Sequence, residues 1–224
     1  MTCSRASWRA RSASQWRESK SGSNAPGLNE LSTPQARFSK FLERLDAIFQ
    51  TEPEFFPYES KLAGAPNLAC MVYRDIPEAG HITGVTYGLS EVAHPAWRSG
   101  RPELIVSLQS TDIAWPLAVA EMANQLRGQC PFGYGDVIDF GGTISEESEM
   151  SAFLVFTPSI LAPHASLGID VGAEQPINIA GMHPIYESER AALAEMGLQK
   201  FCAHPNFDRY DVRRAAVPGV PSGG

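Results

Sequence analysis

The segment that most constrains the fold is RPELIVSL, at residues 101–108. Its apolar residues, Leu104, Ile105, Val106 and Leu108, are almost continuous, whereas a strand with one face in water would alternate apolar and polar residues. A strand of this kind has to be covered on both faces. We therefore expect residues 101–108 to lie at the centre of a sheet.

Two further segments upstream have strand composition. LACMVYR, at 68–74, is a short apolar run suited to a buried strand, and HITGVTYG follows at 81–88 after the turn residues Pro77 and Gly80. The pair predicts a β-hairpin. Residues 52–67, which hold three prolines, are expected to form a loop whose aromatic side chains pack back on the domain.

Three segments carry helix signals. Thr33 followed by Pro34 is typical of a helix start, and the spacing of the apolar residues that follow predicts a helix that ends before Pro53 and buries Phe38, Phe41, Leu42, Leu45, Ile48 and Phe49. Asp112 is expected to cap a second helix that ends near Gly128 and buries Trp115, Val119, Met122, Ala123 and Leu126. A third helix is expected to carry Glu187 and Glu189 in its first turn and to end at Gly197.

The second half of the chain adds strands to this pattern. GDVIDFGG at 135–142, AFLVFTP at 152–158 and INIAGMHPI at 177–185 have strand composition, and 158–175 is expected to be irregular. Helices interleave with strands, but neighbouring hairpins also occur. The sequence thus predicts a mixed α/β (α+β) domain with a central mixed sheet of about six strands and about three packed helices.

The ends of the chain differ from its middle. Residues 1–32 are rich in Ser, Arg and Gly, with five Arg or Lys against two Glu, and are expected to be a disordered basic extension. It is either dispensable to the domain or a basic arm that binds anions. The domain is then expected to span 33–214, with a disordered tail at 215–224. No segment is long and apolar enough for a signal peptide or a membrane span, so we expect a cytoplasmic protein.

Charge indicates the kind of partner. The net charge is -7 over 224 residues, and because the extension is basic, the remainder is near -10. Such a domain is poorly suited to nucleic acid, whose phosphates need a basic surface, and better suited to a basic protein. The densest acidic cluster, Glu146, Glu147 and Glu149, is either a solvated turn or a docking patch for a cationic partner.

Residues with catalytic or metal-binding chemistry are scattered. The four cysteines show no metal or disulfide spacing, and none of the five histidines is in a HExxH pair, so no metal or cofactor is expected. No GxSxG elbow, Walker loop or GxGxxG motif occurs. Arg101 and Glu103 are two residues apart on one strand face, where they could hold each other or a neighbouring loop.

Two other roles stay open. A small-ligand or hydrolytic domain could use a cleft near Asp139, Tyr87 and His183, although Asp139 also fits the solvent face of a strand and Tyr87 fits a core ring or an interface anchor. A structural module of a larger assembly is the third alternative. Tyr87, Asp139, Glu146, Glu147 and Glu149 are the candidate partner-binding residues.

The order and spacing of several short pieces resemble the suppressor-of-fused domain family, over roughly residues 38–198. The pieces that carry the resemblance are Tyr87-Gly88-Leu89-Ser90, Arg101 with Glu103 through Leu108, Ile177-Asn178-Ile179, Pro184 through Glu189 with Tyr186, Glu187 and Glu189, and Gly197-Leu198.

The resemblance implies protein binding without catalysis. Animal members of the family sequester a transcription factor, and many bacterial single-domain members look like immunity proteins that neutralise a cognate toxin. We expect no second domain of the kind that helps animal members clamp a peptide, so their peptide site is not carried over. The resemblance to the single-domain members therefore implies a partner that is a toxin domain, and the acidic charge of this chain favours a basic one.

Overall fold

The computed structural model describes residues 33–219, so the predicted basic extension at 1–32 lies outside the described residues. Seven strands form one sheet with the order β1-β2-β3-β4-β7-β6-β5. All neighbours are antiparallel except β4 and β7, which pair in parallel with Arg101 opposite Ile177. The mixed α/β class is confirmed.

The strongest sequence patterns give the elements at the centre of the sheet. β2 (Leu68–Arg74), β4 (Arg101–Leu108) and β7 (Ile177–Ile185) coincide with the predicted runs, and β3 (Ile82–Tyr87) completes the predicted hairpin with β2. β4 lies in the middle of the seven strands, as its apolar run predicts. Its residues from Pro102 onward are buried.

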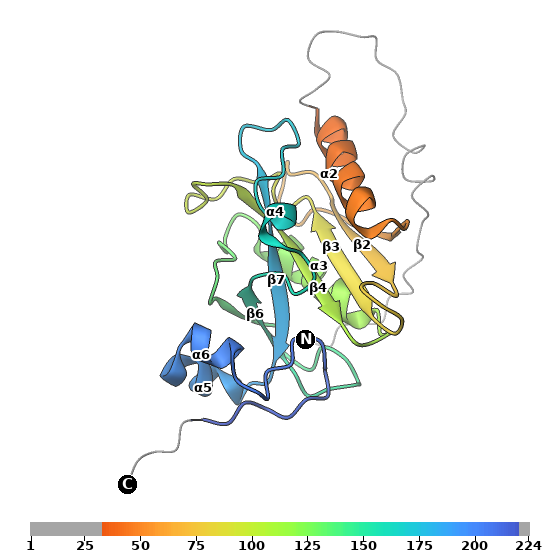
Figure 1. The fold of residues 1–224 in the computed structure, drawn as a ribbon. Coiled ribbons are helices and arrows are strands. Elements are labelled where there is room, and N and C mark those ends of the chain that lie inside the picture. Colours follow the sequence, from red (N-terminus) through yellow and green to blue (C-terminus); the bar gives the residue numbers. More distant parts are fainter. Residues whose placement is uncertain (1–32, 220–224) are drawn as a thin grey trace.

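Two helices cover opposite faces of the sheet (Figure 1). α2 (Pro34–Phe49) is capped by Thr33, whose Oγ1 accepts a hydrogen bond from Ala36 N at 3.2 Å, and its buried stripe packs on one face. α3 (Ala114–Leu126) packs on the other face. It lies so close to β3 that a Cβ on Gly84 would meet Pro116 Cβ at 2.3 Å.

The β5–β6 side of the sheet packs against a separate pair of short helices. β5 (Val137–Asp139) and β6 (Ala152–Phe156) follow α3, and the short helix α4 (Pro163–Ser166) lies near β7. α5 (Glu189–Met196) and α6 (Leu198–Cys202) lie together beside the end of β7 in Figure 1. They enclose a small third core with the apolar residues Ala152, Leu154, Ile185, Ala192, Leu193, Phe201, Phe207 and Val217.

The predicted loop at 52–67 was partly wrong, because residues Glu54–Tyr58 form β1. Phe55, Phe56 and Tyr58 are buried there, and β1 is an edge strand. An edge strand tolerates Pro57 because only one side of its backbone needs hydrogen bonds from a neighbour. The prolines that suggested a loop are therefore compatible with this position.

Several other bounds differ from the sequence expectations. The predicted strand at 135–142 is reduced to the three residues of β5, the irregular link at 158–175 contains α4, and α6 was missed. The third helix begins at Glu189, so Glu187 precedes its first turn. Asp112 lies two residues before α3, where its Oδ1 accepts a hydrogen bond from Ala114 N at 2.9 Å.

The C-terminal segment is also more ordered than expected where the structure describes it. Val217 is buried, and its backbone N donates to Glu189 Oε1 at 2.7 Å. Val217, which lies in the span 215–224 that was expected to be a disordered tail, therefore packs against the start of α5.

Candidate functional site

Part of the predicted family motif, Gly88 and Ser90 with Arg101 beside them, forms a tight structural unit around Glu103 on β4. The rest of the motif, Pro184, Tyr186, Glu187, Glu189 and Gly197, lies at the end of β7 and on or beside α5. The Glu103 side chain is fully buried, and Oε1 accepts hydrogen bonds from Gly88 N at 2.8 Å, Ser90 N at 3.0 Å and Ser90 Oγ at 2.7 Å. Oε2 accepts from Thr86 Oγ1 at 2.6 Å. One carboxylate thus fixes the turn that follows β3.

Arg101 holds the same turn from the outside. Its Nη1 donates to Ser90 O at 3.1 Å. Of the two roles that the sequence left open for Arg101 and Glu103, the structure supports the second, because both side chains hold the neighbouring loop at 88–90.

A buried cation lies near this unit. Arg127, at the end of α3, donates from Nη1 to Pro66 O at 2.7 Å and Gly88 O at 3.3 Å. Burial raises the pKa of Glu103, while its hydrogen bonds from Thr86, Ser90 and Gly88 oppose that rise. Burial lowers the pKa of Arg127, and the negative charge of Glu103 opposes the fall. No local pattern in the sequence indicates Arg127, which reaches the motif only through the tertiary fold.

Tyr87 is an internal anchor in this structure. Its ring is 7% exposed and packs on Phe38 and Phe41 of α2, and its hydroxyl donates to Glu91 Oε1 at 2.9 Å. Glu91 also pairs with Arg37 through Arg37 Nε at 2.9 Å and through Nη2. Burial and the nearby Glu91 carboxylate raise the pKa of Tyr87. The core-ring alternative therefore describes its surroundings better than an exposed interface anchor.

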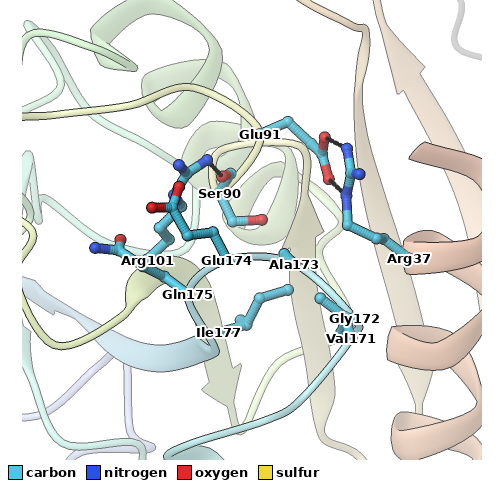
Figure 2. Close-up of a pocket in the computed structure, with 10 residues that line it drawn as sticks. All are labelled: Arg37, Ser90, Glu91, Arg101, Val171, Gly172, Ala173, Glu174, Gln175 and Ile177. Carbon is cyan, nitrogen blue, oxygen red and sulfur yellow. Dashed lines mark hydrogen bonds and ion pairs between the residues drawn. The ribbon is translucent and has the colours of Figure 1, made fainter. Parts of the chain in front are cut away.

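A cavity of about 340 Å³ opens beside the Arg37–Glu91 pair. Figure 2 shows that pair on one side of the cavity and Arg101 with Ser90 on the other, with the segment 171–177 between them. Arg101 and Glu174 bring opposite charges to its rim. Of the residues proposed for partner binding, none lines this cavity.

The predicted acidic cluster lies on the connection between β5 and β6. Glu146 and Glu149 are exposed, but Glu147 is half-buried and accepts hydrogen bonds from Ser110 Oγ and from Trp115 Nε1 at 3.3 Å. Ser145 Oγ also donates to Asp112 Oδ2 at 2.6 Å. Contacts from Ser110 and Asp112, between β4 and α3, and from Trp115 of α3 thus tie down the connection, which presents its outer carboxylates on an ordered backbone.

Asp139 lies at the base of this connection, on β5. Its side chain is 58% exposed, and Oδ2 forms an ion pair with Arg190 Nη2 of α5 at 3.0 Å. Arg190 Nε also contacts Glu187 Oε2 at 2.8 Å. The expectation that Asp139 occupies the solvent face of a strand fits this geometry.

The alternative role required a cleft near Asp139, Tyr87 and His183. None of these three side chains lines either of the two cavities described within residues 33–219. His183 is buried on β7, and its Nε2 is 2.9 Å from Thr157 O. Burial lowers its pKa to about 4. Across residues 33–219, no three His, Cys, Asp or Glu side chains gather as metal ligands, and no helix is long and apolar enough to cross a membrane.

The family model described as "Suppressor of fused protein (SUFU)" matches residues 64–214. The chain belongs to the suppressor of fused family. The matched span contains the whole Glu103 unit and the acidic connection, and the resemblance found in the sequence is confirmed. No curated protein matched the chain.

Solved structures of suppressor of fused proteins share the fold. A homolog from Neisseria gonorrhoeae superposes with a TM-score of 0.61 at 16% identity, covering 80% of this chain and 94% of that one. The Sufu–Fu complex structure gives 0.55 at 13% identity, covering 79% and 90%. Drosophila Suppressor of Fused gives 0.58 at 12% identity, covering 80% of this chain and 50% of that one, so the chain spans about half of the Drosophila protein.

Proposed function

We propose that this suppressor of fused domain is a cytoplasmic, non-enzymatic binding protein that masks a cationic protein partner. The observation that carries the proposal is the acidic connection between β5 and β6, where Glu146 and Glu149 are exposed on a backbone held by Ser145 and Glu147. A fixed array of carboxylates favours association with a basic surface and loses less conformational entropy on binding than a flexible one would.

We further propose that the partner is a toxin and that the domain acts as its immunity protein. The support is the family membership together with the acidic charge of the domain. The solved complex of Sufu with Fu is consistent with protein binding within the family. Binding to a toxin surface would neutralise it by occlusion, without chemistry by this chain.

The test is growth rescue by co-expression with the products of neighbouring genes. A product that arrests growth alone and is tolerated when co-expressed with this protein identifies the partner. If no neighbouring product is neutralised, the immunity role is wrong. The purified complex should weaken steeply as salt rises, because exposed charges are screened over about 10 Å at 0.1 M salt.

A charge-reversal pair tests the surface itself. The double variant Glu146→Lys with Glu149→Lys should weaken the complex by at least about tenfold, since it turns attraction to a basic surface into repulsion. The matched control, Glu43→Lys with Glu52→Lys, changes net charge equally at exposed positions on α2 and after it. Equal weakening by both pairs would mean that net charge, and not this connection, governs binding.

A further inference from the structure

Two opposite charges line the cavity beside the Arg37–Glu91 pair without pairing with each other. Arg101, at the start of β4, and Glu174, on the segment that precedes β7, both line this cavity of about 340 Å³ (Figure 2). Within residues 33–219 no ion pair joins them, and the exposed Glu174 carboxylate accepts no hydrogen bond. Arg37 and Glu91, by contrast, neutralise each other. Arg101 and Glu174 are therefore both available to a ligand.

The guanidinium of Arg101 has an unused edge that suits a carboxylate. Its Nη1 donates to Ser90 O at 3.1 Å, and in the described part of the chain its Nε and Nη2 have no protein acceptor. Neither atom is buried, so a ligand can reach both. Arg37 uses these same two atoms to hold the Glu91 carboxylate at the cavity. A guanidinium binds a carboxylate in this way through two parallel N–H···O bonds.

The charges that line the cavity select the class of ligand. Two are positive, on Arg37 and Arg101, and two are negative, on Glu91 and Glu174. A dianion such as phosphate would meet both carboxylates. An uncharged apolar ligand would take water from Arg101 and Glu174 without replacing its hydrogen bonds. A zwitterion satisfies both groups, with its anion on Arg101 and its cation on Glu174.

Apolar side chains complete the site. Val171 and Ile177, on the segment 171–177, form what we call the apolar wall. The base of that segment is fixed by two backbone hydrogen bonds between Ile169 and Ile177, each of 2.9 Å. The wall is thus formed before a ligand arrives, and binding orders little additional chain. The cavity volume is near the lower end of the range of about 300–1,000 Å³ for small-molecule sites, which favours a ligand with a short apolar side chain.

We propose that this cavity binds a small aliphatic α-amino acid, with its carboxylate on the Nε–Nη2 edge of Arg101, its ammonium on Glu174 and its side chain against the apolar wall. The inference goes beyond the masking of a protein partner, because it assigns a small-molecule site to a cavity that none of the proposed partner-binding residues lines. By joining Arg101 to Glu174, the ligand ties the start of β4 to the segment before β7. A ligand bound only by the folded domain also raises its stability.

The probe is L-leucine, titrated into the full-length protein labelled with ¹⁵N. The amide signals of Ser90, Arg101 and Glu174 should shift saturably, and the melting temperature should rise at saturating ligand. N-acetyl-L-leucine lacks the ammonium and L-leucinamide lacks the carboxylate, so each should bind at least about tenfold more weakly. Glycine keeps both charges but cannot reach the apolar wall, and it should also bind at least about tenfold more weakly.

Glu174→Gln tests the ammonium contact without altering the structural unit at Glu103. It should weaken binding of L-leucine by about tenfold but should not weaken binding of N-acetyl-L-leucine, which has no ammonium to lose. Glu52→Gln, the same change at an exposed position outside the cavity, is the matched control and should leave the binding of both ligands unchanged.

Arg101→Gln tests the carboxylate contact. It should weaken binding of L-leucine by about tenfold but should not weaken binding of L-leucinamide. Because Arg101 also holds Ser90, a thermal melt establishes that the variant is folded. If it is not, Glu174→Gln with its control decides the question.

The outcomes separate this site from the proposed masking role. No saturable shift with L-leucine up to about 10 mM would overturn the site, and so would shifts confined to signals outside Ser90, Arg101 and 171–177. Binding of N-acetyl-L-leucine or inorganic phosphate as tight as that of L-leucine would overturn the assignment to a zwitterion. Each of these results leaves the masking role to its own test, growth rescue. Failure of growth rescue, in turn, would leave the amino-acid site standing.

Discussion

Arg214 and Glu189 form a buried bidentate ion pair that joins the C-terminal segment to α5. Arg214 Nη1 lies 2.5 Å from Glu189 Oε1, and Nη2 lies 2.8 Å from Oε2, with the two side chains 4% and 0% exposed. Glu189 also accepts hydrogen bonds from the backbone N of Tyr186 and of Val217. One carboxylate therefore connects the end of β7, α5 and the last described residues.

Removing one partner of this pair should be costly. Arg214→Ala leaves Glu189 charged, buried and short of donors, and we expect a loss of about 3–5 kcal/mol in the free energy of unfolding. Urea denaturation measures it. Arg213→Ala is the control, because Arg213 is 70% exposed in its ion pair with Glu147 and should change stability by less than about 1 kcal/mol. Similar losses in the two variants would contradict the role assigned to the buried pair.

Thr86 provides a second test, at the point where the β3–β4 ladder stops. The ladder ends with Val85 opposite Ile105, and Thr86 Oγ1 then accepts from Leu104 N at 2.9 Å while donating to Glu103. Thr86→Val keeps the shape of the side chain but leaves Leu104 N and the Glu103 carboxylate without this hydrogen-bond partner. We therefore expect the free energy of unfolding to fall by about 1–3 kcal/mol. Thr143→Val, at an exposed loop position, is the control. An unchanged melting curve for Thr86→Val would show that the hydroxyl is dispensable.

The pH dependence of stability should carry the signature of His183. Its folded-state pKa is lowered to about 4 by burial, against about 6.5 for an unfolded histidine. Between these values the unfolded chain binds the extra proton, so stability is present above pH 6.5 and is lost as pH falls towards 4, by about 3 kcal/mol. His183→Gln keeps a donor for Thr157 O and cannot titrate, so it should flatten this part of the stability profile. His164→Gln, at an exposed position, should leave the slope unchanged, and a steep slope in His183→Gln would assign the effect to other groups.

Thiol labelling should distinguish the cysteines by their burial. Cys70 is fully buried on β2, and burial raises its pKa, whereas Cys130 and Cys202 are partly exposed. In a Cys3→Ser background, which removes the cysteine outside the described residues, a thiol reagent at neutral pH should modify Cys130 and Cys202 first. The thiolate is the reactive form, and burial both keeps the reagent away from Cys70 and disfavours its thiolate. Cys70 should therefore react only as fast as the domain unfolds. Rapid labelling of Cys70 in the native protein would contradict its placement, and labelling in denaturant provides the reference rate.

The sequence was most informative where a pattern has a single physical meaning. The continuous apolar run of β4 could only be satisfied by burial on both faces, and Thr33 with Pro34 marked the start of α2 correctly. β1 was missed because Pro57 usually argues against a strand, and its tolerance depends on an edge position that only the sheet order reveals. Local pattern thus predicts elements well and predicts their place in the sheet less well.

In the candidate site too, the residue types follow from local sequence, but their contacts follow from the tertiary fold. Glu147 belongs to an acidic run in the sequence, yet its contacts with Ser110 and Trp115 come from distant parts of the chain. Glu103 and Arg127 both bond to the backbone of Gly88, and spacing along the sequence cannot show that. The residue types near the site could be predicted, but the direction in which each side chain points could not.

The parallel pairing between β4 and β7, the one such pairing within residues 33–219, has a consequence for how the protein reaches its native state. β1, β2, β3 and β4 pair antiparallel in sequence order and form one group of strands. β5, β6 and β7 likewise pair antiparallel in sequence order and form a second group. Each group can therefore assemble from contacts between neighbouring segments of the chain. Joining Arg101 to Ile177 closes a long stretch of chain that includes α3 and both smaller strands, and contacts of such high sequence separation slow folding. We expect the junction between the two groups to form last on the folding pathway, and a folding intermediate, if one accumulates, to contain the β1–β4 meander without its parallel neighbour.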